Sequence, residues 1–402
     1  MKIGHMISET NQRLGSQAQA PERLSVSQKF GVIPSSTLES RGMQTNNLDR
    51  YKIVMAGDLV LNRFNAYKGA LGVAPKTGIV SPDYFTARTL PGVSNARYLD
   101  YFIRSDPVAD LIKRDMSGMG SADPDSSAFS RFDVQAFLSI KTPGFNLPTQ
   151  RRIADYLDRE TAQIDAMAGA LDGLVARLEE RRQSQIEDVL HANPQAPTTS
   201  VAHGLDSLPG HAFPSERFSD SPDAGYRLLR GINISPEGVR WDNSIFTETS
   251  DKKAETYSLH TGDVVLGMDR PFVNGGTRIA KITELDEGSL LVQRVLRIRT
   301  SDNLLADYFY YTVKSKRFRD YVEPEFTGIS VPHISESQIS RFRIPLPPID
   351  EQRRIVAHLD AETAKIDAMI AKAGELRALL DERRSALITA TVTGQHPVPE
   401  EP

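Results

Sequence analysis

Two polar loops of the 402-residue sequence carry side chains that could bind nucleic acid. The loop "NRFNAYKG" contains Arg63, Asn65, Tyr67 and Lys68, and the loop "MDRPFVNGGTR" contains Arg270, Asn274 and Arg278. In the DNA major groove, arginine pairs well with guanine and asparagine with adenine, each through two hydrogen bonds. For each single residue, a solvated surface charge is the competing interpretation.

Two further polar segments extend these candidate sites. The stretch "SGMGSADPDSSAFSRF" adds Ser121, Ser127 and Arg131 to the first site. The run "KSKRFR" (residues 314–319) is expected to be a basic turn of a helix, and Lys314, Lys316 and Arg317 are suited to phosphate contacts. Because the whole chain has a net charge of −4, a site for a polyanion must be a local patch.

The sequence lacks the motifs of a methyltransferase or an ATPase. It has no Asn/Asp-Pro-Pro-aromatic motif for adenine methylation and no G-x-x-x-x-G-K-[ST] phosphate loop. Its eight histidines show no metal-ligand spacing, and it contains no cysteine. We therefore expect a non-catalytic protein without cofactor or metal. A stand-alone nuclease built on scattered carboxylates such as Asp123 and Asp125 is a less favoured alternative.

A helix that occurs twice must position the two loops. The segment "QRRIADYLDRETAQIDAM" begins at Gln150, and "QRRIVAHLDAETAKIDAM" begins at Gln352. At a constant offset of 202, 20 of the 41 positions from residue 150 to residue 190 are identical. Chance does not give half-identity over an ungapped stretch of this length, so a tandem duplication is the simplest explanation.

Both copies are expected to form long helices. Proline precedes each copy, as Pro148 and as the "PLPP" of residues 345–348, and is absent from residues 150–192 and 351–395. Asp350 is suited to cap the second helix. About 40 residues at 1.5 Å each give a helix of roughly 60 Å.

An apolar stripe at alternating spacings of three and four residues predicts a coiled coil. We expect the two copies to pack against each other antiparallel, because residues 191–201 are a short connection to the second globular segment. A coiled coil with another chain is the alternative. The stripe comprises Leu157, Ile164, Met167, Leu171, Leu174 and Leu178 in the first copy and Leu359, Ile366, Met369, Leu376, Leu380 and Leu387 in the second.

The segments ahead of the two helices are faintly alike. Residues 57–74 align with residues 262–280, each with a Gly-Asp pair, a short apolar strand, a polar loop and a second strand. We expect Asp58 and Asp263 to form turn hydrogen bonds rather than to contact nucleic acid. The predicted fold is α+β: two globular domains joined by two long helices in an antiparallel coiled coil with pseudo-two-fold symmetry. The predicted segments are 1–147 and 196–347 for the globular domains, 148–195 for the first helix, and 348–402 for the second helix with the C-terminal tail.

The sequence resembles the specificity subunits of type I restriction–modification systems. The resemblance rests on "PLPP-x-x-EQRRI" (residues 345–355), on "LD-x-E-T-A-x-I-D" in both copies, and on "GDLVLNR…GV…VSPDY" (residues 57–84). It covers nearly the whole chain. It implies two target-recognition domains, each reading one half of a bipartite double-stranded DNA sequence. It also implies that the helices act as a spacer and dock two methyltransferase subunits, through which motor and endonuclease subunits join.

Gln150, Arg151, Gln352 and Arg353 open the two helices identically and are the expected partner-binding residues. Helix capping and coiled-coil packing are the competing roles for these four residues. Two features depart from the family pattern. The first copy has Pro148-Thr149 where the second has Asp350-Glu351, and little sequence precedes "LSVSQKFGVIP", so the first domain is expected to lack an edge element.

The expected location is the cytoplasm. No apolar run approaches the ~20 residues needed to span a bilayer, and the first 25 residues lack the apolar core of a secretory signal. A coiled-coil adaptor whose globular domains bind proteins is the main functional alternative. The two interpretations differ in whether the chain binds DNA selectively in the presence of its methyltransferase partner.

Overall fold

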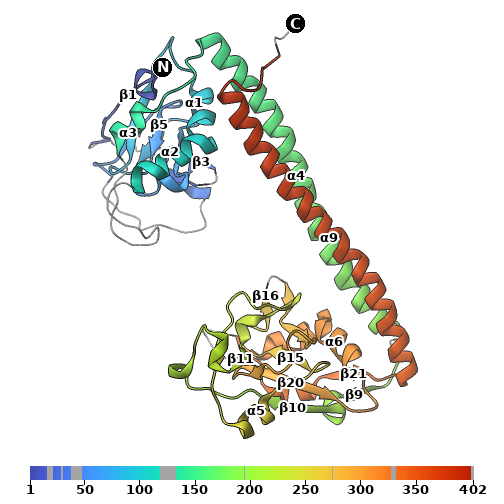
Figure 1. The fold of residues 1–402 in the computed structure, drawn as a ribbon. Coiled ribbons are helices and arrows are strands. Elements are labelled where there is room, and N and C mark those ends of the chain that lie inside the picture. Colours follow the sequence, from blue (N-terminus) through green and yellow to red (C-terminus); the bar gives the residue numbers. More distant parts are fainter. Residues whose placement is uncertain are drawn as a thin grey trace. The chain divides into compact units, whose positions relative to one another are not determined.

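The structure is a computed structural model that describes residues 1–15, 21–28, 30–37, 48–117, 133–193, 195–273, 275–326 and 332–399. It divides into two compact units: unit 1 comprises Met1–Asp172 and Gly374–Pro402, and unit 2 comprises Gly173–Ala373. Each unit holds one globular domain, called head one or head two, and a part of each long helix (Figure 1). Within the described ranges, none of the helices has the length and apolarity that a membrane span requires.

Head one is built on a four-stranded antiparallel sheet. Its strand order is β1 (Ile7–Glu9), β8 (Phe85–Thr89), β5 (Leu59–Leu61) and β6 (Leu71–Val73). Two smaller pairs come from segments between these strands: β2 (Leu24–Ser27) with β3 (Gly31–Pro34), and β4 (Lys52–Val54) with β7 (Gly78–Val80). The helices α1 (Ala96–Ile103), α2 (Asp106–Ser117) and α3 (Val134–Ser139) follow the sheet in sequence.

Head two repeats this plan. Its main sheet has the order β10 (Leu205–Pro209), β20 (Val295–Thr300), β15 (Val264–Gly267) and β18 (Ile279–Lys281). The helices α6 (Ala306–Lys314), α7 (Lys316–Val322) and α8 (Glu336–Arg341) follow. A second sheet of head two contains β11 (Tyr226–Leu229), β14 (Phe246–Thr247) and β19 (Leu290–Leu291). Three strand pairs are added: β12 (Ile234–Ser235) with β13 (Gly238–Val239), β16 (Phe272–Val273) with β17 (Gly276–Thr277), and β9 (Thr198–Ser200) with β21 (Arg343–Pro345). Helix α5 (Asp251–Tyr257) is a further addition.

The two main sheets have the same strand order, and this corrects one expectation. Strand β1 pairs with β8 at the edge of head one, as β10 pairs with β20 at the edge of head two. Head one therefore has its edge strand, and the prediction that it lacks one is wrong. The strand was missed because β1 is only three residues long and its sequence, "ISE", shows no clear alternation.

The Gly-Asp pairs predicted to align do occupy matching turns. The two glycines, which precede β5 and β15, have φ of +88° and +93°, a region that glycine enters without strain. Asp58 and Asp263 are 2% and 4% exposed, and each accepts a hydrogen bond from the backbone N–H three residues earlier, at 2.9 and 3.0 Å. Each carboxylate also pairs with an arginine of the next sheet strand, Arg88 at 3.2 Å and Arg299 at 2.6 Å. Both aspartates serve the turn, as expected.

Two 44-residue helices, α4 (Leu147–Leu190) and α9 (Ile349–Val392), run antiparallel in each unit (Figure 1). In unit 1 the first part of α4 lies against the last part of α9, where Arg384 Nε is 3.1 Å from Asp165 Oδ1. In unit 2 the residues at the same repeat positions exchange helices, and Arg182 Nη1 is 2.7 Å from Asp367 Oδ1. The predicted antiparallel pairing is confirmed.

The seam of the coiled coil differs from the predicted stripe at two positions of each helix. Met167 and Leu174 are 44% and 42% exposed, whereas Ala168 is 5% exposed. From Ile164, the buried residues continue by a step of four to Ala168 rather than by a step of three to Met167. Both stepping patterns fit a heptad repeat, and the prediction chose the one with the larger apolar side chains. Their repeat mates in α9, Met369 and Leu376, are 44% and 43% exposed.

The helix starts also differ from the prediction. Asp350 is not the N-cap of α9: it lies inside the first turn, and its exposed side chain pairs with Arg353 at 2.8 Å. The backbone carbonyl of Pro348 accepts the first helical N–H groups instead, at 2.9 and 3.0 Å. In α4, Asn146 Oδ1 accepts a hydrogen bond from Thr149 N at 3.0 Å, which is a capping contact.

Candidate nucleic-acid interface

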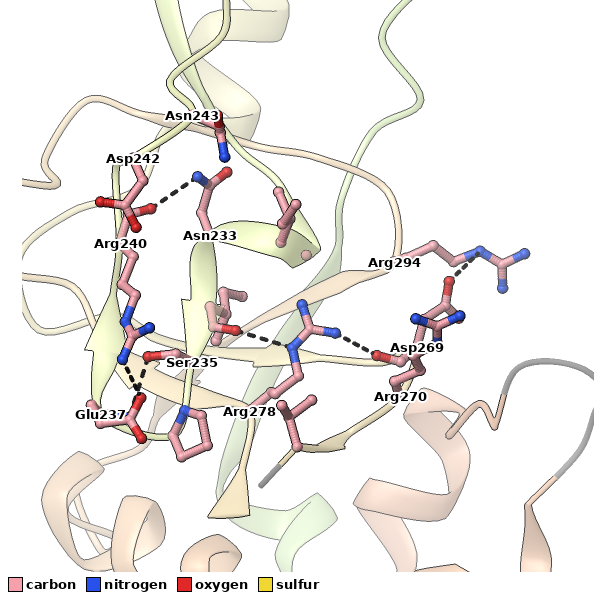
Figure 2. Close-up of a pocket in the computed structure, with 15 residues that line it drawn as sticks. Asn233, Ser235, Glu237, Arg240, Asp242, Asn243, Asp269, Arg270, Arg278 and Arg294 are labelled. Atoms are coloured by element: carbon pink, nitrogen blue, oxygen red, sulfur yellow. Dashed lines mark hydrogen bonds and ion pairs between the residues drawn. The ribbon is translucent and has the colours of Figure 1, made fainter. Parts of the chain in front are cut away.

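A polar pocket of about 620 Å³ opens in head two between the loops that join its sheet strands (Figure 2). The predicted loop between β15 and β18 forms one wall, and the segment around β12 and β13 forms the opposite wall. Four arginines and three carboxylates line the pocket, so its charge is positive by one. The charged and amide side chains are Arg240, Arg270, Arg278, Arg294, Glu237, Asp242, Asp269, Asn233 and Asn243.

Arg270 and Arg294 stand on strained backbone at one side of this pocket. Their φ values are +43° and +67°, and they are the only non-glycine residues with positive φ in the described part of the chain. This conformation is uncommon for a side chain with a Cβ, and such strain tends to cluster at functional sites. Both side chains are exposed, and Arg294 Nε lies 3.8 Å from Asp269 Oδ2. Two guanidinium groups are thus held at the pocket mouth.

Backbone hydrogen bonds keep these two arginines in place. The N–H of Arg270 donates to Pro332 O at 2.7 Å, and the N–H of Met268 donates to Arg294 O at 2.9 Å. Between them, Asp269 Oδ1 lies 2.8 Å from His333 Nδ1. The strained residues are therefore tied to neighbouring segments on both sides, which restricts the orientation of their side chains.

Arg278, also predicted to bind DNA, braces the pocket from inside. Its Nε donates to Ile234 O at 3.0 Å and its Nη1 donates to Asp269 O at 2.8 Å, so it links the two walls (Figure 2). Burial lowers the pKa of Arg278. Because two of its donor groups serve backbone carbonyls, this residue positions the site more than it can contact a ligand.

Sequence reasoning missed Arg240, Asn243 and Arg294. Arg240 and Asn243 are exposed at the opposite wall, where Arg240 pairs with Glu237 at 2.9 Å. The buried Asn233 donates to Arg240 O at 2.9 Å and so fixes the backbone of this wall. No local pattern marks these residues, because they reach the pocket only through the pairing of distant strands.

The basic run of residues 314–319 is not one turn of a helix, and its side chains diverge. Helix α6 ends at Lys314 and α7 begins at Lys316, with Ser315 capping α7. Lys314 points back to the pocket wall, where its Nζ donates to Pro236 O at 3.1 Å. Lys316 pairs with Asp320 in its own helix, and the N–H of Arg317 donates to Glu187 at the end of α4. The expected cluster for phosphates does not form.

In head one, the matching loop between β5 and β6 carries Arg63, Asn65 and Lys68. The buried Nε of Arg63 has no hydrogen-bond partner among the described residues. Lys52 is 8% exposed beside it, and burial together with the Arg63 charge lowers the pKa of Lys52. A positive charge that is buried beside another positive charge favours the approach of an anion.

Several predicted residues lie outside the described part of the chain. These are Ser121, Ser127, Arg131 and Asn274, together with the side chain of Tyr67. Their predicted roles stay predictions.

The repeated Gln150 joins head one to its helix. It is fully buried, its Nε2 donates to Val93 O at 3.0 Å and Phe145 O at 2.8 Å, and its Oε1 accepts from Asn95 N at 2.8 Å. Its amide groups are thus occupied within the chain. Arg151 beside it is exposed, and its predicted partner-binding role stays a prediction.

Gln352 makes the equivalent joint in head two. It is also fully buried, with Nε2 donating to Asn303 O at 2.9 Å and Pro347 O at 2.8 Å, and Oε1 accepting from Leu305 N at 2.9 Å. The contacts of both glutamines favour the packing role that competed with partner binding. The neighbour Arg353 is exposed and pairs with Asp350 in the first turn, and its predicted partner-binding role stays a prediction.

A tyrosine reinforces each joint about two turns further along the long helix. Tyr101 donates to Asp158 Oδ1 at 2.8 Å, and Tyr311 donates to Asp360 Oδ1 at 2.6 Å. Burial raises the pKa of Tyr101 to about 12, with a further contribution from Asp158. Both phenols are therefore held in the protonated form that donates to the helix.

Comparison with known proteins gives a consistent result. The family of the type I restriction modification DNA specificity domain matches residues 229–376. The chain is 34% identical over 155 residues to the specificity subunit of the type I restriction enzyme EcoAI of Escherichia coli, covering 38% of this chain and 26% of that protein. It is 23% identical over 277 residues to the MjaVIII specificity subunit of Methanocaldococcus jannaschii, covering 65% of this chain and 64% of that protein. In both cases the match spans less than two thirds of the relative.

Solved structures share the fold along nearly the whole chain. One solved structure comes from a study of complex assembly and conformational transition of the type I R-M system. A chain of that structure matches this chain with a TM-score of 0.71 at 15% identity, and 98% of this chain and 97% of that chain are covered. The HsdS subunit of Thermoanaerobacter tengcongensis has a TM-score of 0.50 at 16% identity, with 98% and 96% covered. Residues 229–376 are thus a type I restriction modification DNA specificity domain, and the resemblance of the chain to type I specificity subunits is confirmed.

Proposed function

We propose that this chain is the DNA sequence-specificity subunit of a type I restriction–modification complex. The observation that carries the proposal is the pocket of head two, which is lined by Arg270 and Arg294 from two loops, each with strained backbone at the arginine. Arginine on a fixed backbone is suited to the two acceptor atoms of guanine, and the exposed Asn243 on the opposite wall is suited to adenine. Neither head needs catalytic groups for this role, so the chain acts as a non-catalytic subunit.

The two heads read the two halves of a bipartite double-stranded target. Both heads present a loop between equivalent sheet strands, with Arg63, Asn65 and Lys68 in head one and Arg270 in head two. Since the loops differ in sequence while the sheets share one plan, the half-sites differ. The antiparallel helices act as the spacer between them, and phosphates along the target contact basic side chains such as Lys68.

The helix starts dock two methyltransferase subunits, and motor and endonuclease subunits join through them. Two copies of one surface bind two copies of one partner. In this proposal the exposed Arg151 and Arg353 belong to these surfaces, and the buried Gln150 and Gln352 shape them. The complex works in the cytoplasm, where bacterial and archaeal chromosomes lie.

The test is to co-express the chain with its methyltransferase partner and to map methylated adenines across the host genome. We expect methylation at one bipartite motif, and we expect replacement of residues 1–147 by another head to change one half of that motif only. Methylation without a defined sequence, or a motif that survives the exchange unchanged, would overturn the proposal. A chain that binds the partner but selects no DNA would instead support the adaptor interpretation.

A further inference from the structure

A groove lies beside the start of α9 in unit 2, and the described part of the chain leaves it open. In unit 2 the groove has a volume of about 720 Å³ and is lined mostly by apolar side chains. They come from the end of α4, the connection after it, and the start of α9. The lining includes Leu190, Tyr308, Pro347, Ile355 and His358.

In unit 1 the C-terminal tail, residues 393–399, lies over the repeat-related surface at the start of α4. His396 Nε2 lies 3.1 Å from the phenol oxygen of Tyr156 on α4, and Val398 packs against the core of head one. The effect is seen at one pair of repeat mates: Ile153, under the tail, is 3% exposed, whereas Ile355 in the open groove is only partly buried. The two surfaces lie at matching repeat positions, but the described tail covers only the one in unit 1.

The chain itself explains this difference. After α9, Gly394 turns the chain back with φ of +82°, and the N–H groups of Gln395 and His396 donate to Ala390 O at 2.8 and 3.0 Å. A Cβ at Gly394 would lie 2.9 Å from the ring of Phe145, so the tail passes close to the surface in unit 1. After α4, in contrast, the chain continues into β9, which pairs with β21. This connection lines one side of the groove of unit 2 and then leaves it for the strand pair.

We propose that the open groove of unit 2 receives an extended apolar segment of the methyltransferase partner, seated as the C-terminal tail is seated in unit 1. The inference rests on the proposed function, and it names one contact of that partner. The tail shows which chemistry such a groove accepts: a short extended segment with proline and a small apolar side chain, here "TGQHPVP".

The two surfaces differ at one repeat position of the long helices, and this difference indicates which side chain the occupant supplies. In unit 1 the helix supplies a phenol, from Tyr156, and the tail supplies an imidazole. In unit 2 the helix supplies an imidazole, from His358, at the repeat position of Tyr156. The complementary occupant therefore supplies a hydroxyl, and we assign a tyrosine to the partner segment. The tail of a second copy of this chain would place imidazole against imidazole and is the less suited occupant.

Two fluorescein-labelled peptides test the assignment on the full chain by fluorescence anisotropy. One is the tail sequence TVTGQHPVP, and the other is TVTGQYPVP, with tyrosine in place of histidine. We expect the tyrosine peptide to bind about fivefold more tightly, the effect of one added hydrogen bond. Ile355→Glu should abolish its binding, and His358→Ala should remove the preference. Leu379→Glu, a change at an exposed leucine of α9, is the matched control and should have no effect.

Two further measurements complete the test. Purified methyltransferase partner should displace the tyrosine peptide from the full chain. In a chain that ends at Gln395, shown by circular dichroism to be folded, the histidine peptide should gain a second site in unit 1. Tighter binding of the histidine peptide to the full chain would assign the groove to a second copy instead. A partner that directs methylation to one motif but leaves the peptide bound would overturn this inference and leave the proposed function intact.

Discussion

Gln150 and Gln352 lie 202 positions apart in the sequence and make the same three hydrogen bonds, one set in each unit. Every partner atom is a backbone atom, either in the loop ahead of the first helix after the main sheet (α1 or α6) or in the turn ahead of the long helix. The contacts of the glutamine at each joint thus depend on the path of the backbone and not on the side chains of the head.

Replacement of either glutamine by leucine should therefore destabilise its unit. The change strands buried backbone groups, and each unsatisfied group costs about 1–3 kcal/mol. We expect Gln150→Leu and Gln352→Leu each to lower the free energy of unfolding by about 2–4 kcal/mol, measured by urea denaturation. Gln163→Leu, at an exposed position of α4, is the control. Equal, small effects at all three positions would show that the hydrogen bonds of the two glutamines do not stabilise their units.

The register of the seam predicts opposite outcomes for two adjacent residues. Met167→Glu should change the free energy of unfolding by less than about 0.5 kcal/mol, because the side chain is exposed. Ala168→Glu should cost more than about 2 kcal/mol, because it places a charge in the seam. Thermal unfolding of both variants provides the comparison. If Met167→Glu were the more destabilising of the two changes, the register predicted from the sequence would be the correct one.

Arg270→Ala and Arg294→Ala should each weaken binding of the cognate DNA by about 10- to 100-fold, since one two-bond pair with a base is worth about 1–3 kcal/mol. Alanine keeps the Cβ and hence the backbone strain, so the change removes only the guanidinium. Binding is measured with the methyltransferase partner present, and Lys365→Ala, on α9, serves as the control. A uniform loss on cognate and unrelated DNA would assign these arginines to phosphates instead.

High pH should loosen the joint of head one. The pKa of Tyr101 is raised from 10.0 to about 12 by burial. A raised pKa means that its stabilising effect is complete below pH 10 and is lost as the pH rises toward 12. Urea denaturation at pH 9 and pH 11 should show a fall in stability that is smaller in Tyr101→Phe. If the two proteins respond identically, the phenol does not titrate as described.

If the helices set the distance between half-sites, shortening both should shorten the target. Removal of residues 170–176 and 372–378 deletes one heptad at the same repeat position of each helix and preserves the seam. Seven residues correspond to about 10 Å of helix, or roughly three base pairs at 3.4 Å each. We expect methylation at the same half-sites with a spacer about three base pairs shorter, or loss of methylation. A change in the bases of a half-site would contradict the spacer role.

The features predicted correctly from the sequence are those that repeat at a fixed offset or depend on residues close together in the chain. The duplicated helix, its antiparallel packing and the turns of Asp58 and Asp263 all follow from patterns within a few residues or from one fixed offset. The pocket could not be predicted as a whole, because Arg294 and Asn243 come from segments that meet Arg270 only after the strands pair. The role of Arg278 was missed for the same reason: its partners are backbone carbonyls of distant loops, which no sequence motif records.

The shared strand order of the two heads has a consequence for how such a protein can change over generations. The main sheets of the two heads have the same strand order, while the additional described strands differ in number and length. Insertions in the loops of those additions leave the strand pairing of the main sheet unchanged. Selection for a new target can therefore act on one head at a time, and an exchanged head can fold before it has acquired a useful preference.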